Sequence, residues 1–122
     1  MTVGQVQYYQ PLIKQEINKP EYKITVSNID YAAALAAGEE ASIKISLENT
    51  GDFDLENVNL KMSVYDLEIY ESTKLDLKKG KSVTKTFNVD IPENAASGYY
   101  DLKITLNSDK ISRVLYREIF VT

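Results

Sequence analysis

A two-residue alternation of apolar and polar side chains recurs along this chain and limits the folds open to it. The apolar residues Ala41, Ile43, Ile45 and Leu47 alternate with Ser42, Lys44, Ser46 and Glu48. Such alternation predicts a strand with one face in a core and the other in water. Residues 49–52, Asn-Thr-Gly-Asp, end the strand because Asn and Gly tolerate positive φ. The sequence therefore predicts a half-buried strand followed by a turn.

The same patterns predict further strands on both sides of this one. Alternation, or a β-branched and aromatic composition, occurs at residues 22–26, 58–64, 67–77, 83–91, 100–106 and 112–121. Lys85 interrupts the apolar phase of its segment, so we expect it near a sheet edge or extended toward solvent. The segment 67–77 has room for one or two short strands, and in 112–121 either face could be the buried one. We expect about seven strands in total.

The segment 32–37 has high helix propensity, but it is too short to form a stable helix. We expect a bend or a single turn there. The segment also begins an internal echo, in which Leu35-x-x-Gly38 and Leu77-x-x-Gly80 each precede an alternating strand. The echo predicts that the two strands are neighbours and that their turns lie at the same end of the fold.

Several strands without a long amphipathic helix indicate an all-β domain made of two packed antiparallel sheets. We predict an immunoglobulin-like antiparallel β-sandwich with Greek-key topology, and a β-barrel of similar strand count is the alternative. A chain of 122 residues has the size of one ordinary domain. We place the sandwich at residues 22–122 and an N-terminal arm or linker at residues 1–21.

Four short motifs in fixed order support this fold assignment: Leu35-Ala-Ala-Gly38, Glu48-Asn49-Thr50-Gly51, Ile91-Pro92 and Ser97-Gly98-Tyr99-Tyr100. Together they resemble the NEW3/CARDB group of domains, which is found in archaeal and bacterial surface proteins, and the resemblance covers roughly residues 22–122. It implies an immunoglobulin-like fold and a part in adhesion, surface-layer or envelope architecture. The resemblance implies no catalytic residues.

The composition excludes the commonest catalytic chemistries. The chain contains no His and no Cys, so it has neither the usual general base nor the usual zinc ligands. Its carboxylates are scattered singly along polar strand faces rather than paired as acid and base. We expect no enzyme activity and no cofactor.

Charge and hydropathy exclude further partners. The net charge of −4 opposes the phosphate neutralisation that dominates nucleic-acid binding. No apolar run reaches the ~18 residues that a membrane span needs, so we expect no membrane insertion by this segment.

The loop after the first alternating strand contains a candidate calcium site. Asp52, Asp54 and Glu56 stand at alternate positions, so an extended loop could bring their carboxylates onto one hard cation. A solvated acidic turn is the competing and favoured interpretation. Phe53 and Leu55 between them either cap the end of the sandwich or form a small contact patch, and burial decides between these two.

Two adjacent tyrosines follow Gly98. Tyr100 shares the inward phase of its strand, and we expect it in the core in a form similar to a tyrosine corner. We expect Tyr99 on a sheet surface, where it is a candidate partner contact.

The N-terminal arm is uncharged between residues 2 and 10 and contains Val3, Val6, Tyr8 and Tyr9. One interpretation is a linker. The sharper hypothesis is that these four residues pair as a strand with the exposed sheet edge of a neighbouring subunit.

These observations predict a non-catalytic extracellular structural or adhesion module that acts through protein–protein contacts. Its partners would be other copies of itself or neighbouring domains, with assembly into a surface layer or filament through the arm. The alternative is a carbohydrate- or ligand-binding accessory domain of a larger surface enzyme. That alternative requires an exposed aromatic platform with polar groups beside it.

Overall fold

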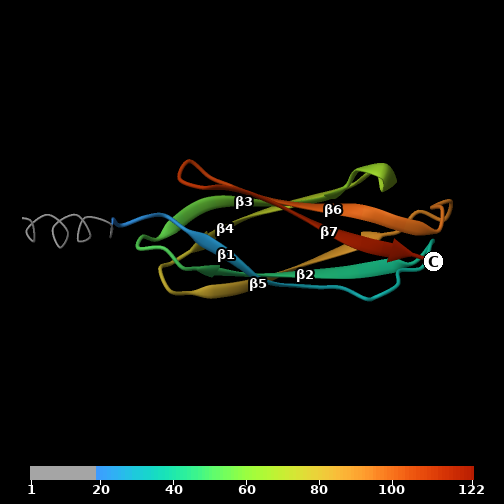
Figure 1. Cartoon of the computed structure of the whole chain (residues 1–122), viewed down its shortest axis with the longest axis horizontal. Helices are drawn as coiled ribbons and strands as arrows, with labels where there is room; N and C mark the ends of the chain where they lie inside the picture. Colours follow the sequence, from blue (N-terminus) through green and yellow to red (C-terminus); the bar gives the residue numbers. More distant parts are fainter. Residues whose placement is uncertain (1–18) are drawn as a thin grey trace, which may run out of the picture.

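Seven antiparallel strands form two facing sheets in the part of the chain that the structure, a computed structural model, describes, residues 19–122 (Figure 1). One sheet has the order β1-β2-β5 and the other the order β4-β3-β6-β7. The strands are β1 (Ile24–Asp30), β2 (Glu40–Asn49), β3 (Leu55–Val64), β4 (Ile69–Leu77), β5 (Ser82–Asp90), β6 (Gly98–Asn107) and β7 (Ser112–Val121). The predicted all-β immunoglobulin-like sandwich is confirmed. The domain boundary at residue 22 stays a prediction.

The core lies between the two sheets and is made of the inward residues of the alternating strands. On β2 the side chains of Ile43, Ile45 and Leu47 are fully buried, as the alternation predicted. Each such side chain contributes roughly 1.5–3 kcal/mol when it is removed from water. On β7 the buried face is that of Ile119 and Val121, which settles the facing of the last strand.

Residues 67–77 contain one strand, not two. A 3₁₀ turn, η3 (Tyr65–Leu67), follows β3, and Glu68 then takes a left-handed conformation with φ of 56°. The Glu68 N–H donates to the carbonyl of Tyr65 at 3.0 Å. This tight reversal returns the chain along β3 as β4.

The Leu-x-x-Gly echo marks two neighbouring strands, since β2 and β5 pair along their whole length. The expectation that both turns lie at one end is wrong, because the two strands run antiparallel. The Gly38 N–H donates to the carbonyl of Ile91 after β5, and the Gly80 N–H donates to the carbonyl of Asn49 at the end of β2. The two glycines, with φ of 82° and 77°, therefore occupy equivalent turns at opposite ends of the sandwich.

The segment 32–37 forms a bend, as predicted, and also makes a contact that the sequence did not indicate. Leu35 is buried and forms a parallel bridge with Val121 of β7. The Leu35 N–H donates to the carbonyl of Phe120 at 2.8 Å, and the Thr122 N–H donates to the carbonyl of Leu35 at 2.9 Å. These bonds hold the C-terminus, which lies at the end of the sandwich opposite to residue 19 (Figure 1).

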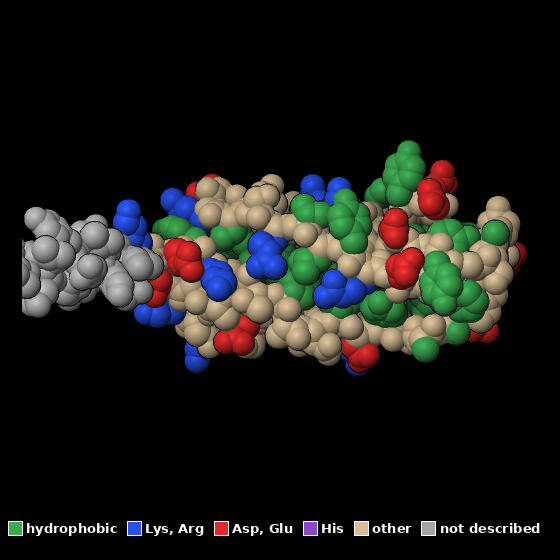
Figure 2. Space-filling model, in the orientation of Figure 1, with side chains coloured by type: hydrophobic (Ala, Val, Ile, Leu, Met, Phe, Trp, Pro, Cys, Tyr) green, Lys and Arg blue, Asp and Glu red, His purple; other side chains and the backbone are tan. Residues whose placement is uncertain are grey.

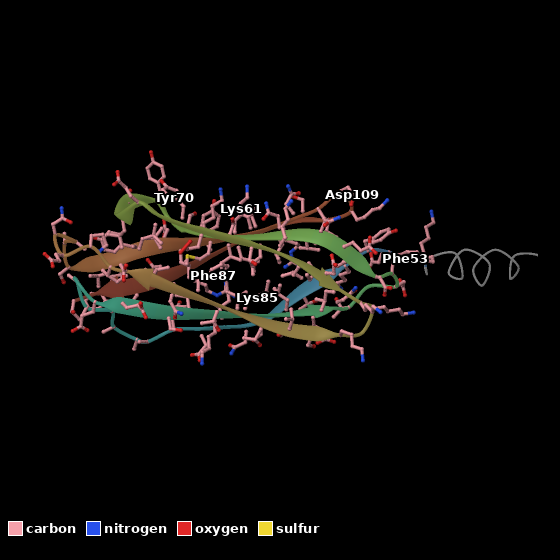
Figure 3. The ribbon with its side chains drawn as sticks, turned by 180° about the vertical axis from the view of Figure 1, so that it is seen from behind. Phe53, Lys61, Tyr70, Lys85, Phe87 and Asp109 are labelled. Carbon is pink, nitrogen blue, oxygen red and sulfur yellow. The ribbon has the colours of Figure 1, made fainter. Side chains whose placement is uncertain are left out.

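Each edge strand carries a feature that opposes the addition of another strand. On β5, Lys85 stands in the inward phase opposite Ile45, as its interruption of the alternation predicted. On β4, Glu71 stands in the inward phase opposite Met62. A register shift at Ser27 disturbs β1, and Leu35 covers the end of β7. Inward charges, bulges and covered ends are the usual protection of sheet edges. Figure 3 shows the side of the sandwich that carries Lys85.

Candidate functional site

Exposed aromatic and apolar side chains gather on the outward face of the four-stranded sheet, which we call the aromatic face. Its members are Tyr70 of β4, Tyr99 of β6, and Val114, Tyr116 and Phe120 of β7. Tyr99 is 71% exposed, Tyr70 60%, Tyr116 57% and Val114 50%. The rings of Tyr99 and Phe120 pack with their centroids 5.0 Å apart.

Strand register brings two of these tyrosines into one row across the sheet. Ser63 stands opposite Tyr70 on one side and Lys103 on the other, and Lys103 stands opposite Tyr116. With strands ~4.8 Å apart, the two tyrosines lie about 14 Å from each other across the row. A shallow hollow at the Tyr70 end of the row is lined by Lys61, Met62, Ser63, Tyr70, Glu71, Ser72, Lys103 and Thr105.

The outward face of the three-stranded sheet has the opposite character. On β2 its outward residues are Glu40, Ser42, Lys44, Ser46 and Glu48, and on β5 they are Ser82, Thr84, Thr86, Asn88 and Asp90. None of these side chains is apolar. The asymmetry distinguishes the aromatic face from an ordinary solvated sheet surface.

Tyr100 and Tyr99 occupy the places that the sequence predicted. Tyr100 packs against the core, and its hydroxyl donates to the carbonyl of Ala96 at 2.6 Å. A hydroxyl bond to the backbone a few residues upstream is the geometry of a tyrosine corner. Tyr99 lies on the aromatic face, where its role as a partner contact stays a prediction.

The acidic loop after β2 uses its carboxylates for bonds to the backbone. Asp52 accepts the N–H of Glu21 at 2.9 Å, and Asp54 accepts the N–H of Lys79 at 2.8 Å. Glu56 is exposed on β3. Within residues 19–122 there is no group of three or more Asp or Glu side chains that could hold a metal ion. The structure therefore does not bring the calcium candidates together.

Burial separates the two apolar residues of this loop. Leu55 is in the core, whereas Phe53 is 40% exposed and stacks on Tyr22 with ring centroids 4.6 Å apart. The ammonium group of Lys110 lies 5.3 Å from the centroid of the Tyr22 ring. Leu55 thus caps the core, and Phe53 holds the segment before β1 against the loop.

Asn49 organises this end of the domain, a role that its turn propensity alone did not reveal. Its side chain is buried and donates to the carbonyls of Phe53 and Leu77, each at 2.8 Å. Its Oδ1 accepts the Gly51 N–H at 3.0 Å. One amide side chain therefore joins the end of β2, the acidic loop and the end of β4.

Gly51 is required for a close backbone contact. A Cβ at this position would lie 2.5 Å from the nitrogen of Lys23 and 2.7 Å from the oxygen of Glu21. The Gly51 N–H donates to the carbonyl of Lys23, and the Asp52 N–H donates to the carbonyl of Glu21. The Asn-x-Gly motif thus fixes the segment that leads into β1.

The remaining predicted contacts, Val3, Val6, Tyr8 and Tyr9, lie outside the described residues. Across residues 19–122, no helix has the length and apolar character needed to cross a membrane.

Solved structures show the same fold at low sequence identity. The CARDB domain of the PF1109 protein from Pyrococcus furiosus, crystallised in complex with di-metal ions, matches with a TM-score of 0.71 and 14% identity. The match covers 85% of this chain and 96% of that domain. A solution structure of the same domain matches with a TM-score of 0.67 and 15% identity, covering 85% of this chain and 98% of that one.

A β-glucosidase from Listeria innocua contains a similar domain. It matches with a TM-score of 0.55 and 17% identity over 84% of this chain. The match covers only 16% of the β-glucosidase, so the likeness concerns one small part of that enzyme.

Comparison with curated proteins gave no match. Residues 35–108, more than half of the chain, match the family described as "NPCBM-associated, NEW3 domain of alpha-galactosidase". The description names a domain of an enzyme rather than an enzyme, and the expected likeness to NEW3 and CARDB domains is confirmed. The chain belongs to the NEW3 domain family.

Proposed function

We propose that this domain is a non-catalytic accessory module of a larger extracellular protein and that it binds a protein surface through its aromatic face. One observation supports the proposal above the others: exposed tyrosines gather on one outward sheet face, while the opposite outward face is polar. Tyrosine suits such contacts because it offers a large apolar ring with a polar end at low entropic cost.

The protected edge strands favour contact through the aromatic face over contact by strand addition. Lys85 and Glu71 stand in the inward phase of two edge strands, and Leu35 covers the end of a third. Strand addition would have to bury these charges or displace Leu35. Assembly into a surface layer or filament by strand addition of the N-terminal arm is therefore the less favoured form of contact.

Site-specific photocrosslinking tests the contact. A benzoylphenylalanine in place of Tyr116 on the aromatic face should crosslink to a polypeptide when the domain is produced within its natural protein in its own cells. The matched control is the same residue in place of Lys44, on the polar outward face. Crosslinks from both positions at equal yield, or none to a polypeptide from position 116, would refute the proposal.

Fractionation of the same cells tests the location. The crosslinked species should lie in the surface or culture fraction and be digested by protease added to intact cells. Full protection from the protease would contradict an extracellular place.

Glycan binding is a second candidate, favoured by the row that joins Tyr70 and Tyr116 through Ser63 and Lys103. Aromatic rings beside hydroxyl and ammonium groups are the platform that carbohydrate recognition requires. Titration with soluble galactosides and glucosides should then change tyrosine fluorescence, and replacement of Tyr70 by Ala should abolish the change. Unchanged fluorescence at saturating glycan would exclude this candidate.

A further inference from the structure

Charged side chains on the aromatic face are divided between its two halves. The half nearer residue 19 carries Lys61, Lys74 and Lys103. The half nearer the C-terminus carries Asp101 and Glu118, with Asp66 and Glu68 beside them at η3. Figure 2, which shows the β7 side, has acidic side chains grouped near the hydrophobic ones toward the C-terminal end. Two acidic residues also lie in the basic half: Asp76, which accepts the Asn57 N–H at 2.8 Å, and the exposed Glu56 at the start of β3.

This division makes the face complementary to itself. We infer that the partner of the aromatic face is a second copy of this chain, related by a two-fold axis that lies in the face and runs across the strands. The inference rests on the proposed function, because it uses the same contact surface. A two-fold axis across the strands lays the basic half of each copy over the acidic half of the other. An axis along the strands would lay like charges over each other.

Strand register fixes which residues meet. The axis passes between the row of Lys103 and the row of Asp101, which are adjacent outward positions on β6. Lys103 then faces Asp101 of the partner subunit, and by symmetry the reverse contact forms as well. On β7, the same operation places Val114 over the partner's Phe120. Opposite charges thus meet beside the axis, and the apolar pair lies one row farther from it on β7.

The size of the face predicts weak association. Four strands of up to ten residues cover about 650 Å², at ~4.8 Å per strand and ~3.4 Å per residue. A standard interface buries about 800 Å² per partner. The dimer should therefore form and dissociate with concentration, and added salt should weaken it because salt screens the attraction between its opposite charges.

A reciprocal charge exchange tests the geometry on the full chain. One variant carries Lys61→Glu and Lys103→Glu, so both halves of its face are acidic. The other carries Asp101→Lys and Glu118→Lys, so the sheet surface carries lysines in both halves of the face. Each variant alone should be monomeric by sedimentation velocity at concentrations where the wild type dimerises. An equimolar mixture should dimerise again, because every contact then joins opposite charges. Thermal melts followed by circular dichroism verify that both variants are folded.

Three results would overturn the inference: a wild type that stays monomeric at all concentrations, variants that dimerise alone, or a mixture that fails to dimerise. The crosslinks from position 116 separate this failure from that of the proposed function. Crosslinks to a different polypeptide, with a monomeric wild type, would refute the self-pairing and leave the protein contact standing. An absence of any crosslink to a polypeptide would refute both.

Discussion

Asn49 is the buried polar side chain on which one end of the sandwich depends. Its amide joins the carbonyls of Phe53 and Leu77, and its oxygen accepts the Gly51 N–H. An isolated buried amide would be unfavourable, but bonded in this way it selects one arrangement of three segments.

Replacement of Asn49 by Ala should lower the free energy of unfolding by about 2–4 kcal/mol, since the carbonyls of Phe53 and Leu77 lose their donor and the Gly51 N–H keeps only the carbonyl of Lys23. Asn88→Ala, at an exposed position of β5, is the matched control and should change stability by less than about 0.5 kcal/mol. Urea unfolding measures both. Similar values for the two variants would show that the Asn49 network contributes little.

The role of the Tyr100 hydroxyl can be tested by comparing its removal with removal of the neighbouring Tyr99 hydroxyl. Tyr100→Phe removes the bond to the Ala96 carbonyl and should cost about 1 kcal/mol. Tyr99→Phe removes an exposed hydroxyl and should be nearly neutral. A Tyr100→Phe variant as stable as the wild type in thermal unfolding would contradict the tyrosine corner.

At the scale of single residues, the sequence predicted which side chains are buried but not what the polar ones bind. The alternation from Ala41 to Leu47 assigns the core face of β2, because side chains on a strand repeat with period two. The hydrogen-bond partners of Asn49, in contrast, include a residue that is distant in the sequence. Leu77 lies 28 positions away, so no local pattern could have indicated that bond.

Single elements show how a local defect can protect a sheet. Lys85 interrupts the apolar phase of β5 and stands on its core side opposite Ile45. A charge in this position must be left in water, so it penalises any strand that would cover the edge.

Lys85→Val completes the alternation of Val83, Phe87 and Val89, and should raise the stability of the monomer by about 1 kcal/mol. The same change should produce assemblies larger than those of the wild type, because the edge then lacks its charge. Light scattering across a concentration series measures this. Thr86→Val, on the outward face of the same strand, is the control and should leave the size distribution as it is. Equal size distributions of the two variants would contradict the protective role of Lys85.

At the scale of elements, strand positions were predictable and strand partners were only partly so. The Leu-x-x-Gly echo correctly marked β2 and β5 as neighbours, yet it placed their turns at one end because spacing carries no information on direction. The parallel bridge of Leu35 to Val121 had no signal in the sequence, since a single bridge needs no alternation.

For the whole molecule, the sandwich was predictable and the aromatic face was not. Tyr70, Tyr99 and Tyr116 stand on three different strands, far apart in sequence. Only the order β4-β3-β6-β7 and its register bring them onto one surface. The sequence predicted contacts in the N-terminal arm and at Tyr99, and of these Tyr99 lies on the aromatic face.

The bridge between Leu35 and β7 also determines how the domain would carry tension. Residues 19 and 122 lie at opposite ends of the sandwich, so a pull between them draws Leu35 and Val121 in opposite directions along a parallel contact (Figure 1). The bonds from Leu35 to Phe120 and from Thr122 to Leu35 are then loaded in shear and must fail together. A pull on the opposed residues Asp30 and Lys44 would instead open the β1–β2 ladder one pair at a time.

Because the chain has no cysteine, cysteines introduced at chosen positions give unique attachment points for single-molecule stretching. Attachment at residues 20 and 122 should require a clearly higher unfolding force than attachment at residues 30 and 44 at the same pulling speed. Equal forces would show that the bridge bears no load. If the forces differ as expected, a single bridge makes this domain a stiff link in whatever chain of domains it joins.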